Sequence, residues 1–199
     1  MSNTKFEPRG IVFDCDGTLA DTMPLHWKVW KAVTERHRLH FPEDRFYSLG
    51  GVPSRDILKM LSQEQGVPVD NLAVAHEKEE EYLTMLAQVE PIHIVVDVAR
   101  ENFGKIPMAV ASGGNQPVII KVLEHLGIRH LFNAVVTSED VVNQKPAPDI
   151  FLEAARRIGV APQFCRAYED TDIGLQAIAS AGMDGIDVRT LRSGAEKKF

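Results

Sequence analysis

The sequence has few cysteines and no long apolar run. Only two cysteines, Cys15 and Cys165, occur among its 199 residues, so neither a disulfide framework nor a four-cysteine zinc site is available. No stretch approaches the roughly 18 consecutive apolar residues of a membrane span. Residues 1–9 are polar and lack the apolar segment of a secretion signal. These absences lead us to expect a protein that works in the reducing cytoplasm.

The chain also lacks a basic block. Lysine and arginine number 22 against 28 aspartates and glutamates, a formal net charge of -6. Binding to nucleic acid or to an anionic membrane depends on cations that meet phosphates, so we expect neither partner. Hydrophobic residues make up 44% of the chain, which is enough for a folded core. No long apolar stripe is left unassigned, and we therefore expect a monomer.

Short apolar runs alternate with helical patterns over the first 19 and the last 110 residues. Three of the later patterns have apolar residues at helical spacing and end at Gly127, Gly159 and Gly182. This alternation predicts crossover units and a parallel sheet, hence an α/β fold of the Rossmann-like kind. The predicted strands are 10–13, 108–111, 134–136, 165–168 and 185–188, and the helices span about 118–126, 150–158 and 175–181.

The interval 20–89 interrupts the alternation. It contains three helical patterns and no strand pattern, with Ser54 and Asp70 as expected helix caps. We expect residues 1–19 and 90–199 to form the α/β core domain, and residues 20–89 to form an inserted helical cap domain. The charged run 77–81 is typical of a solvated helix face. We expect Trp27 and Trp30 to lie in the interior of the cap.

Polar side chains follow four of the predicted strands. In a parallel sheet the carboxyl ends of the strands lie along one edge, so we expect these side chains to converge there. The four segments are residues 14–18, 112–115, 145–146 and 169–172.

The converging groups suit phosphoryl transfer. Carboxylates provide hard oxygen ligands for Mg²⁺, and Asp14, Asp16, Glu169 and Asp170 carry them. The hydroxyl of Ser112 and a lysine cation fit phosphate oxygens. Such transfer depends on positioning and charge neutralisation, and a carboxylate can serve as its nucleophile. The sequence has no G-x-S-x-G motif, no P-loop and no G-x-G-x-x-G.

The residues 14–18, Asp-Cys-Asp-Gly-Thr, resemble the first motif of the haloacid dehalogenase superfamily. Ser112 corresponds to the second motif, Lys145 to the third, and Glu169-Asp170 to the fourth. The pattern of Thr22, His26, Trp30, Gly51 and Arg55 is similar to the subgroup that contains β-phosphoglucomutase and small sugar-phosphate phosphatases. Within this subgroup the chain looks closest to phosphatases that act on fructose 1-phosphate. The resemblance implies a haloacid-dehalogenase fold, Mg²⁺ as cofactor and a small phosphorylated metabolite as substrate.

The resemblance also implies roles for individual residues. Asp14 would attack phosphorus and become an aspartyl-phosphate, and Asp16 would act as acid and then as base. Mg²⁺ would be held by Asp14, the backbone carbonyl of Asp16, Asp170 and Glu169, the last as ligand or as support for Asp170. The phosphate-binding residues would be Ser112, Gly113 and Lys145, and the substrate or cap contacts would be Thr22, His26, Arg55, Lys78 and Asn115.

Several alternatives stay open from the sequence. Ser112 could cap the helix that starts near Pro117, His26 could be a packed histidine, and Arg55 could form a surface salt bridge. A phosphosugar mutase would use the same groups, although mutases usually carry a basic residue where Gly114 stands. A non-catalytic sugar-phosphate sensor and a dehalogenase are further rivals. Cys15 is expected to be buried and inert, because its side chain should point away from those of its neighbours.

Overall fold

A computed structural model describes residues 6–195 of the chain. The outer ends of the two expected core segments, residues 1–5 and 196–199, lie outside the described residues. The described part contains a five-stranded parallel sheet with the order β3-β2-β1-β4-β5. The strands are β1 (Gly10–Phe13), β2 (Met108–Ala111), β3 (Ala134–Val136), β4 (Cys165–Glu169) and β5 (Asp184–Asp187). The predicted α/β class is therefore confirmed.

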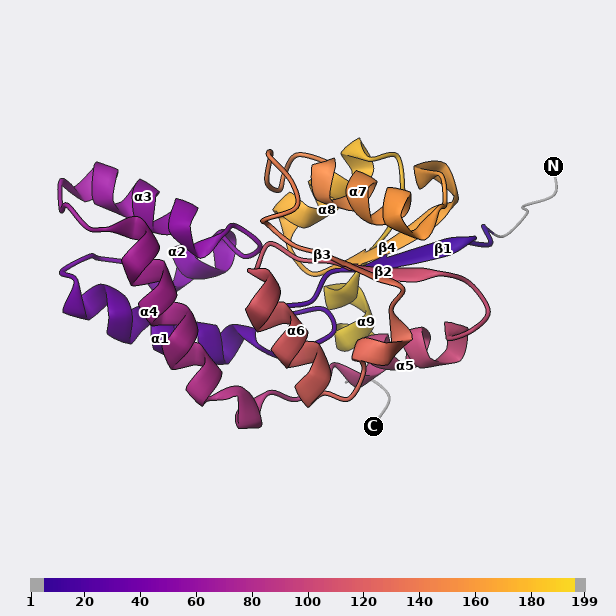
Figure 1. The fold of residues 1–199 in the computed structure, drawn as a ribbon, viewed down its shortest axis with the longest axis horizontal. Coiled ribbons are helices and arrows are strands. Elements are labelled where there is room, and N and C mark those ends of the chain that lie inside the picture. Colours follow the sequence, from indigo (N-terminus) through magenta and orange to yellow (C-terminus); the bar gives the residue numbers. More distant parts are fainter. Residues whose placement is uncertain (1–5, 196–199) are drawn as a thin grey trace.

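Helices cover both faces of this sheet, as Figure 1 shows. Along β1 successive side chains alternate between the two faces. Ile11 and Phe13 belong to one apolar cluster with residues of α5, α6 and α9, whereas Val12 belongs to the other with residues of α7 and α8. The covering helices are α5 (His93–Asn102), α6 (Gln116–His125), α7 (Asp149–Ile158), α8 (Asp172–Ser180) and α9 (Val188–Ala195).

In the sequence, four further helices lie between β1 and α5. In space they lie at the end of the molecule toward which the strands run (Figure 1). They are α1 (Met23–Arg36), α2 (Glu43–Ser48), α3 (Ser54–Gln65) and α4 (Asn71–Thr84). We call them the four-helix segment. Trp30 is buried in its interior and Trp27 packs against Phe46, as expected. The expected cap of α4 is present, because the Asp70 carboxylate accepts hydrogen bonds from the amides of Leu72 and Ala73.

Several local predictions were wrong. The fifth strand ends at Asp187, and Val188 begins α9. Ser54 is the first residue of α3 and does not cap the helix. Its hydroxyl instead donates a hydrogen bond to the carboxylate of Glu79 on α4. Helices α2, α5 and α9 were not predicted at all.

Candidate active site

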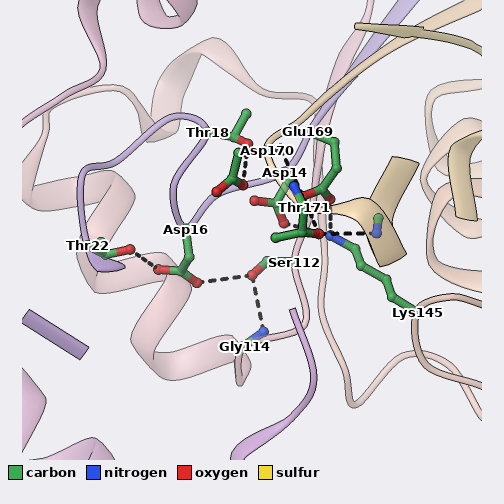
Figure 2. A network of polar contacts seen from close by, with 11 residues as sticks. Asp14, Asp16, Thr18, Thr22, Ser112, Gly114, Lys145, Glu169, Asp170 and Thr171 are labelled. Carbon is green, nitrogen blue, oxygen red and sulfur yellow. Dashed lines mark hydrogen bonds and ion pairs between the residues drawn. The ribbon is translucent and has the colours of Figure 1, made fainter. Parts of the chain in front are cut away.

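The polar segments that follow the strands meet at the carboxyl edge of the sheet. The central strand β1 has β2 on one side and β4 on the other, so the strand order reverses there, which is where open α/β sheets bind ligands. Asp14 follows β1 directly and Glu169 is the last residue of β4. Figure 2 shows their carboxylates turned toward one another, with Lys145 reaching them from the loop after β3.

Lys145 joins the two carboxylates. Its ammonium group donates to Asp14 Oδ1 at 2.7 Å and to Glu169 Oε2 at 2.7 Å, and all three side chains are buried. Burial alone would lower the pKa of Lys145, but the two carboxylates outweigh it and raise that pKa above its ordinary value. The lysine is therefore a fixed cation at this site, and its side chain is not exposed to solvent.

Glu169 and Asp170 are held by hydrogen bonds from their own loop and from the loop after β1. Glu169 Oε1 accepts bonds from the amides of Asp170 and Thr171 at 3.0 and 2.9 Å, and from the Thr171 hydroxyl. Thr18 donates its hydroxyl to Asp170 Oδ1 at 3.1 Å. Gly17, with φ of +85°, leaves room for this carboxylate, because a Cβ at that position would collide with it.

Three carboxylates form a compact cluster around one point. Oxygen atoms of Asp14, Glu169 and Asp170 all lie within 4.8 Å of one another. Burial and the charge of Glu169 raise the pKa of Asp14 well above its usual range, against the opposing effect of Lys145. Burial and the same glutamate raise the pKa of Asp170 to about 7. Two buried acids and the half-buried Asp170 against one ammonium group leave an excess of negative charge that suits a divalent cation with a preference for oxygen ligands.

Asp16 lies in a different environment from Asp14, although both line the same cavity. Its Oδ1 accepts a hydrogen bond from Thr22 at 2.7 Å and lies 3.3 Å from His26 Nε2, while Ser112 donates to its Oδ2 at 3.5 Å. Burial works to raise the pKa of Asp16. The bonds from His26 and Thr22 and the charge of Lys78 outweigh burial and hold that pKa at about 2.

His26 connects Asp16 to the four-helix segment. The Lys78 ammonium group on α4 lies 3.0 Å from His26 Nδ1, so the ring accepts there and donates through Nε2 to Asp16. The ring also stacks on Tyr82, with 3.9 Å between the ring centroids. Burial and the positive charge of Lys78 lower the pKa of His26, and the ring is therefore neutral at pH 7.

The loop 112–115 lies against the four-helix segment. The hydroxyl of Ser112 accepts a hydrogen bond from the amide of Gly114 at 3.1 Å. Gly113 touches the carbonyl of Gly51 so closely that a Cβ on Gly113 would collide with it. Asn115, and not Ser112, caps α6, because its side chain accepts a hydrogen bond from the amide of Val118 at 3.1 Å. The structure thereby rules out the helix-cap interpretation of Ser112.

The remaining candidates from the sequence are less central. Arg55 and Asn115 line a neighbouring hollow between the four-helix segment and the sheet, and Arg55 lies 3.8 Å from Asp56. Lys78 is only 3% exposed, so the charged run 77–81 is not a uniformly solvated helix face. Cys15 is buried as expected, and burial and the nearby aspartates raise the pKa of its thiol.

Sequence reasoning missed several residues that shape the site. Thr18 and Thr171 position the carboxylates, and both stand inside motifs that were already recognised, so a closer look at those motifs could have found them. Glu79 lines the cavity from the four-helix segment. Its sequence surroundings contain no signal of this position, because it depends on how the helices pack.

The fold and the site together define a Rossmann-like α/β enzyme with a candidate active site at the carboxyl edge of the sheet. A family model described as haloacid dehalogenase-like hydrolase matches residues 8–182. The chain belongs to this family of hydrolases, as its four motifs had indicated. No helix in the described part of the chain is both long and apolar enough to cross a membrane.

Individual relatives support the same family assignment. The chain is 42% identical to the fructose-1-phosphate phosphatase YqaB of Escherichia coli, over 92% of this chain and 97% of the relative. It is 30% identical to the beta-phosphoglucomutase of Bacillus subtilis, over 90% of this chain and 83% of the relative. The crystal structure of beta-phosphoglucomutase from Clostridium difficile matches with a TM-score of 0.79 and 25% identity, over 91% of this chain and 84% of that one.

Proposed function

We propose that this protein is a magnesium-dependent phosphatase that hydrolyses a small sugar phosphate, with fructose 1-phosphate as the first substrate to test. The observation that carries the proposal is the buried Lys145 ammonium group between Asp14 and Glu169, beside the carboxylate of Asp170. The 42% identity with the Escherichia coli phosphatase supports the choice of substrate. The acidic residues and the fixed cation provide a nucleophile and a binding site for a transferring phosphate.

Asp14 is the proposed nucleophile. Its carboxylate oxygen attacks phosphorus, the bond from phosphorus to the sugar oxygen breaks, and the phosphate stays on Asp14 as an acyl phosphate. Asp16 gives a proton to the departing sugar oxygen. It then takes a proton from the water that attacks the acyl phosphate, which releases inorganic phosphate and restores Asp14. Both side chains line the same cavity, as this sequence of steps requires.

The cluster of Asp14, Glu169 and Asp170 is suited to Mg²⁺, and the family resemblance adds the backbone carbonyl of Asp16. When bound, the ion would neutralise negative charge on the carboxylates and on the phosphate. The raised pKa values of Asp14 and Asp170 describe the cluster with Lys145 as its cation, and added positive charge lowers both. Asp14 would then be ionised, as a nucleophile must be.

The low pKa of Asp16 fits its second task. His26 and Thr22 keep the carboxylate ionised and ready to accept a proton from water. A phosphate dianion that enters the cavity brings negative charge close to Asp16, and this raises the pKa of Asp16 toward the value that an acid needs.

We further propose that residues 20–89 act as a cap domain over this site. Ser112, Gly113 and Lys145 would bind the phosphate, while His26 and Lys78 line the cavity from the other side and would meet the sugar. Thr22 would act through its hydrogen bond to Asp16. Arg55 and Asn115 line the adjoining hollow and would contact the outer part of the substrate. Closure of the cap over the substrate would exclude bulk water during the first transfer.

The experiment is an assay of phosphate release from a panel of sugar monophosphates, with Mg²⁺ and with excess EDTA. We expect activity only with Mg²⁺, and we expect Asp14→Asn to lower kcat by about a thousandfold or more, because it removes the nucleophile. Asp97→Asn on α5, far from the site and exposed in its pair with Arg100, serves as the matched control. Asp14→Asn that keeps more than a few per cent of the activity would exclude Asp14 as nucleophile.

A mutase is the alternative, favoured by the 30% identity with the Bacillus subtilis enzyme. The same incubation distinguishes the two reactions when glucose 1-phosphate is the substrate. A phosphatase releases inorganic phosphate, whereas a mutase accumulates glucose 6-phosphate without net release.

A further inference from the structure

Glu79 is a carboxylate that none of the proposed steps uses, although it faces the substrate. It lies on α4, lines the cavity that contains Asp14 and Asp16, and its side chain is only 12% exposed. Its Oε1 accepts two hydrogen bonds, from the Ser54 hydroxyl at 2.7 Å and from the Lys78 ammonium group at 3.1 Å. Within residues 6–195, no donor reaches its second oxygen, Oε2, which is therefore available to a ligand.

The four-helix segment forms one wall of the cavity, and the charges on this wall cancel one another. Among the described residues that line the cavity, Lys78 is the only lysine or arginine. Its ammonium group donates to His26 Nδ1 and to Glu79 Oε1, and a ring that accepts at Nδ1 and donates through Nε2 carries no positive charge. A second phosphate placed against this wall would meet the Glu79 carboxylate, while Lys78 is already engaged and Arg55 lines the adjoining hollow, not this cavity.

Sugar hydroxyl groups suit the same wall. A carboxylate oxygen accepts hydrogen bonds from hydroxyl donors, and a bond to a charged acceptor is stronger than one between neutral groups. The rest of the wall is largely apolar and leaves few competing acceptors. These apolar lining residues from the four-helix segment are Met23, Trp30, Phe46, Leu49, Val52 and Ile57.

We propose that Glu79 determines substrate specificity: it binds hydroxyl groups of a monophosphorylated polyol and excludes substrates that carry a second phosphate at the end facing the four-helix segment. This inference rests on the proposed phosphatase activity and narrows its substrate class. Glu79 is a binding residue in this scheme, because it contacts the sugar and takes no part in the transfer.

The test compares kcat/KM for fructose 1-phosphate and for fructose 1,6-bisphosphate in three proteins: the wild type, Glu79→Gln and Glu80→Gln. Glutamine keeps an acceptor oxygen for Ser54 and Lys78 but removes the charge. Glu80 is the matched control, since it is the next residue of the same helix, carries the same charge and has a 68% exposed side chain.

The wild type is expected to prefer the monophosphate. In Glu79→Gln we expect a higher KM for the monophosphate and a preference that shrinks by about tenfold, since one repulsive charge has been removed. Glu80→Gln should keep the wild-type preference. A purely structural role of Glu79 would lower kcat for both substrates alike and leave their ratio unchanged.

The outcomes separate the inference from the function on which it rests. A wild type that hydrolyses neither ester overturns both. A wild type that is active but shows no preference, or a preference that Glu79→Gln leaves intact, overturns the role of Glu79 alone. An equal change in Glu79→Gln and Glu80→Gln also overturns it, because a long-range charge effect would then explain the result.

Discussion

The hydroxyl group of Tyr82 gives a sharp test of the packing around the site. Tyr82 is fully buried on α4, and its ring stacks on His26 at an interplanar angle of 16°. In the part of the chain that the structure describes, its hydroxyl has no hydrogen-bond partner. A buried hydroxyl without a partner loses its bonds to water on folding, and this loss destabilises the native state.

The substitution Tyr82→Phe removes the hydroxyl and keeps the stacked ring. Burying an unpaired hydroxyl costs about 1–3 kcal/mol, and the small void left by the missing oxygen offsets part of the gain from removing it. We expect the free energy of unfolding to rise by about 1 kcal/mol, which corresponds to a Tm higher by about 2–4 °C for a domain of this size. A tyrosine whose hydroxyl is well bonded would respond in the opposite direction.

The measurement is urea unfolding of the full chain at pH 7. The midpoint urea concentrations of the variant and the wild type are compared, provided that the slope of the unfolding free energy against urea concentration is unchanged. Tyr47→Phe is the matched control, because Tyr47 is 44% exposed and should change stability by less than about 0.5 kcal/mol. If Tyr82→Phe destabilised the protein by about 1 kcal/mol, the hydroxyl would have a partner such as an enclosed water molecule, and the reasoning would be refuted.

Two further substitutions test contacts away from the proposed catalytic carboxylates. Gly113→Ala places a Cβ against the carbonyl of Gly51 and should prevent the proposed cap from closing fully. We expect kcat/KM to fall about ten- to a hundredfold with little loss of stability, and steady-state kinetics with unchanged kcat/KM would contradict that contact. Arg157 and Thr137 hydrogen-bond Asp140 and, against burial, lower the pKa of that carboxyl. A lowered native pKa stabilises the protein above the ordinary aspartate pKa, and this contribution disappears as the pH falls through the native value. Asp140→Asn should therefore cost about 1 kcal/mol at pH 7 and progressively less below about pH 4, and a deficit that does not depend on pH would disprove the ionic origin.

The sheet and the residues at its edge could be predicted because each depends on short local patterns. Buried parallel strands appear as brief apolar runs, and the first three strands have the expected bounds. The topology then brings Asp14, Lys145 and Glu169 together, although 155 residues separate the first from the last. The fifth strand has the sequence Asp-Gly-Ile-Asp, which contains a single apolar residue, and its bounds were accordingly misjudged.

The helical insertion was harder to predict, because packing between helices decides which residues face the cavity. Lys78 and Glu79 stand in a run of charged residues that resembles a solvated face, yet α4 packs against α1 and α3 and turns both toward the site. Helix α2 has only six residues and is too short to show a helical period. Helix α5 carries Val95, Val96 and Ala99 at helical spacing and was open to prediction.

The two aspartates of the first motif differ in chemistry because different parts of the fold surround them. Asp14 faces Glu169, Asp170 and Lys145 from the sheet edge, where burial and the charge of Glu169 raise its pKa. Asp16 faces His26 on α1, and Lys78 on α4 contacts that histidine in turn. A change in α4 therefore acts on the proposed acid and base without altering the carboxylate cluster. In the proposed mechanism the sheet edge would keep one phosphoryl-transfer chemistry, while the four-helix segment would adjust both the timing of proton transfer and the choice of sugar.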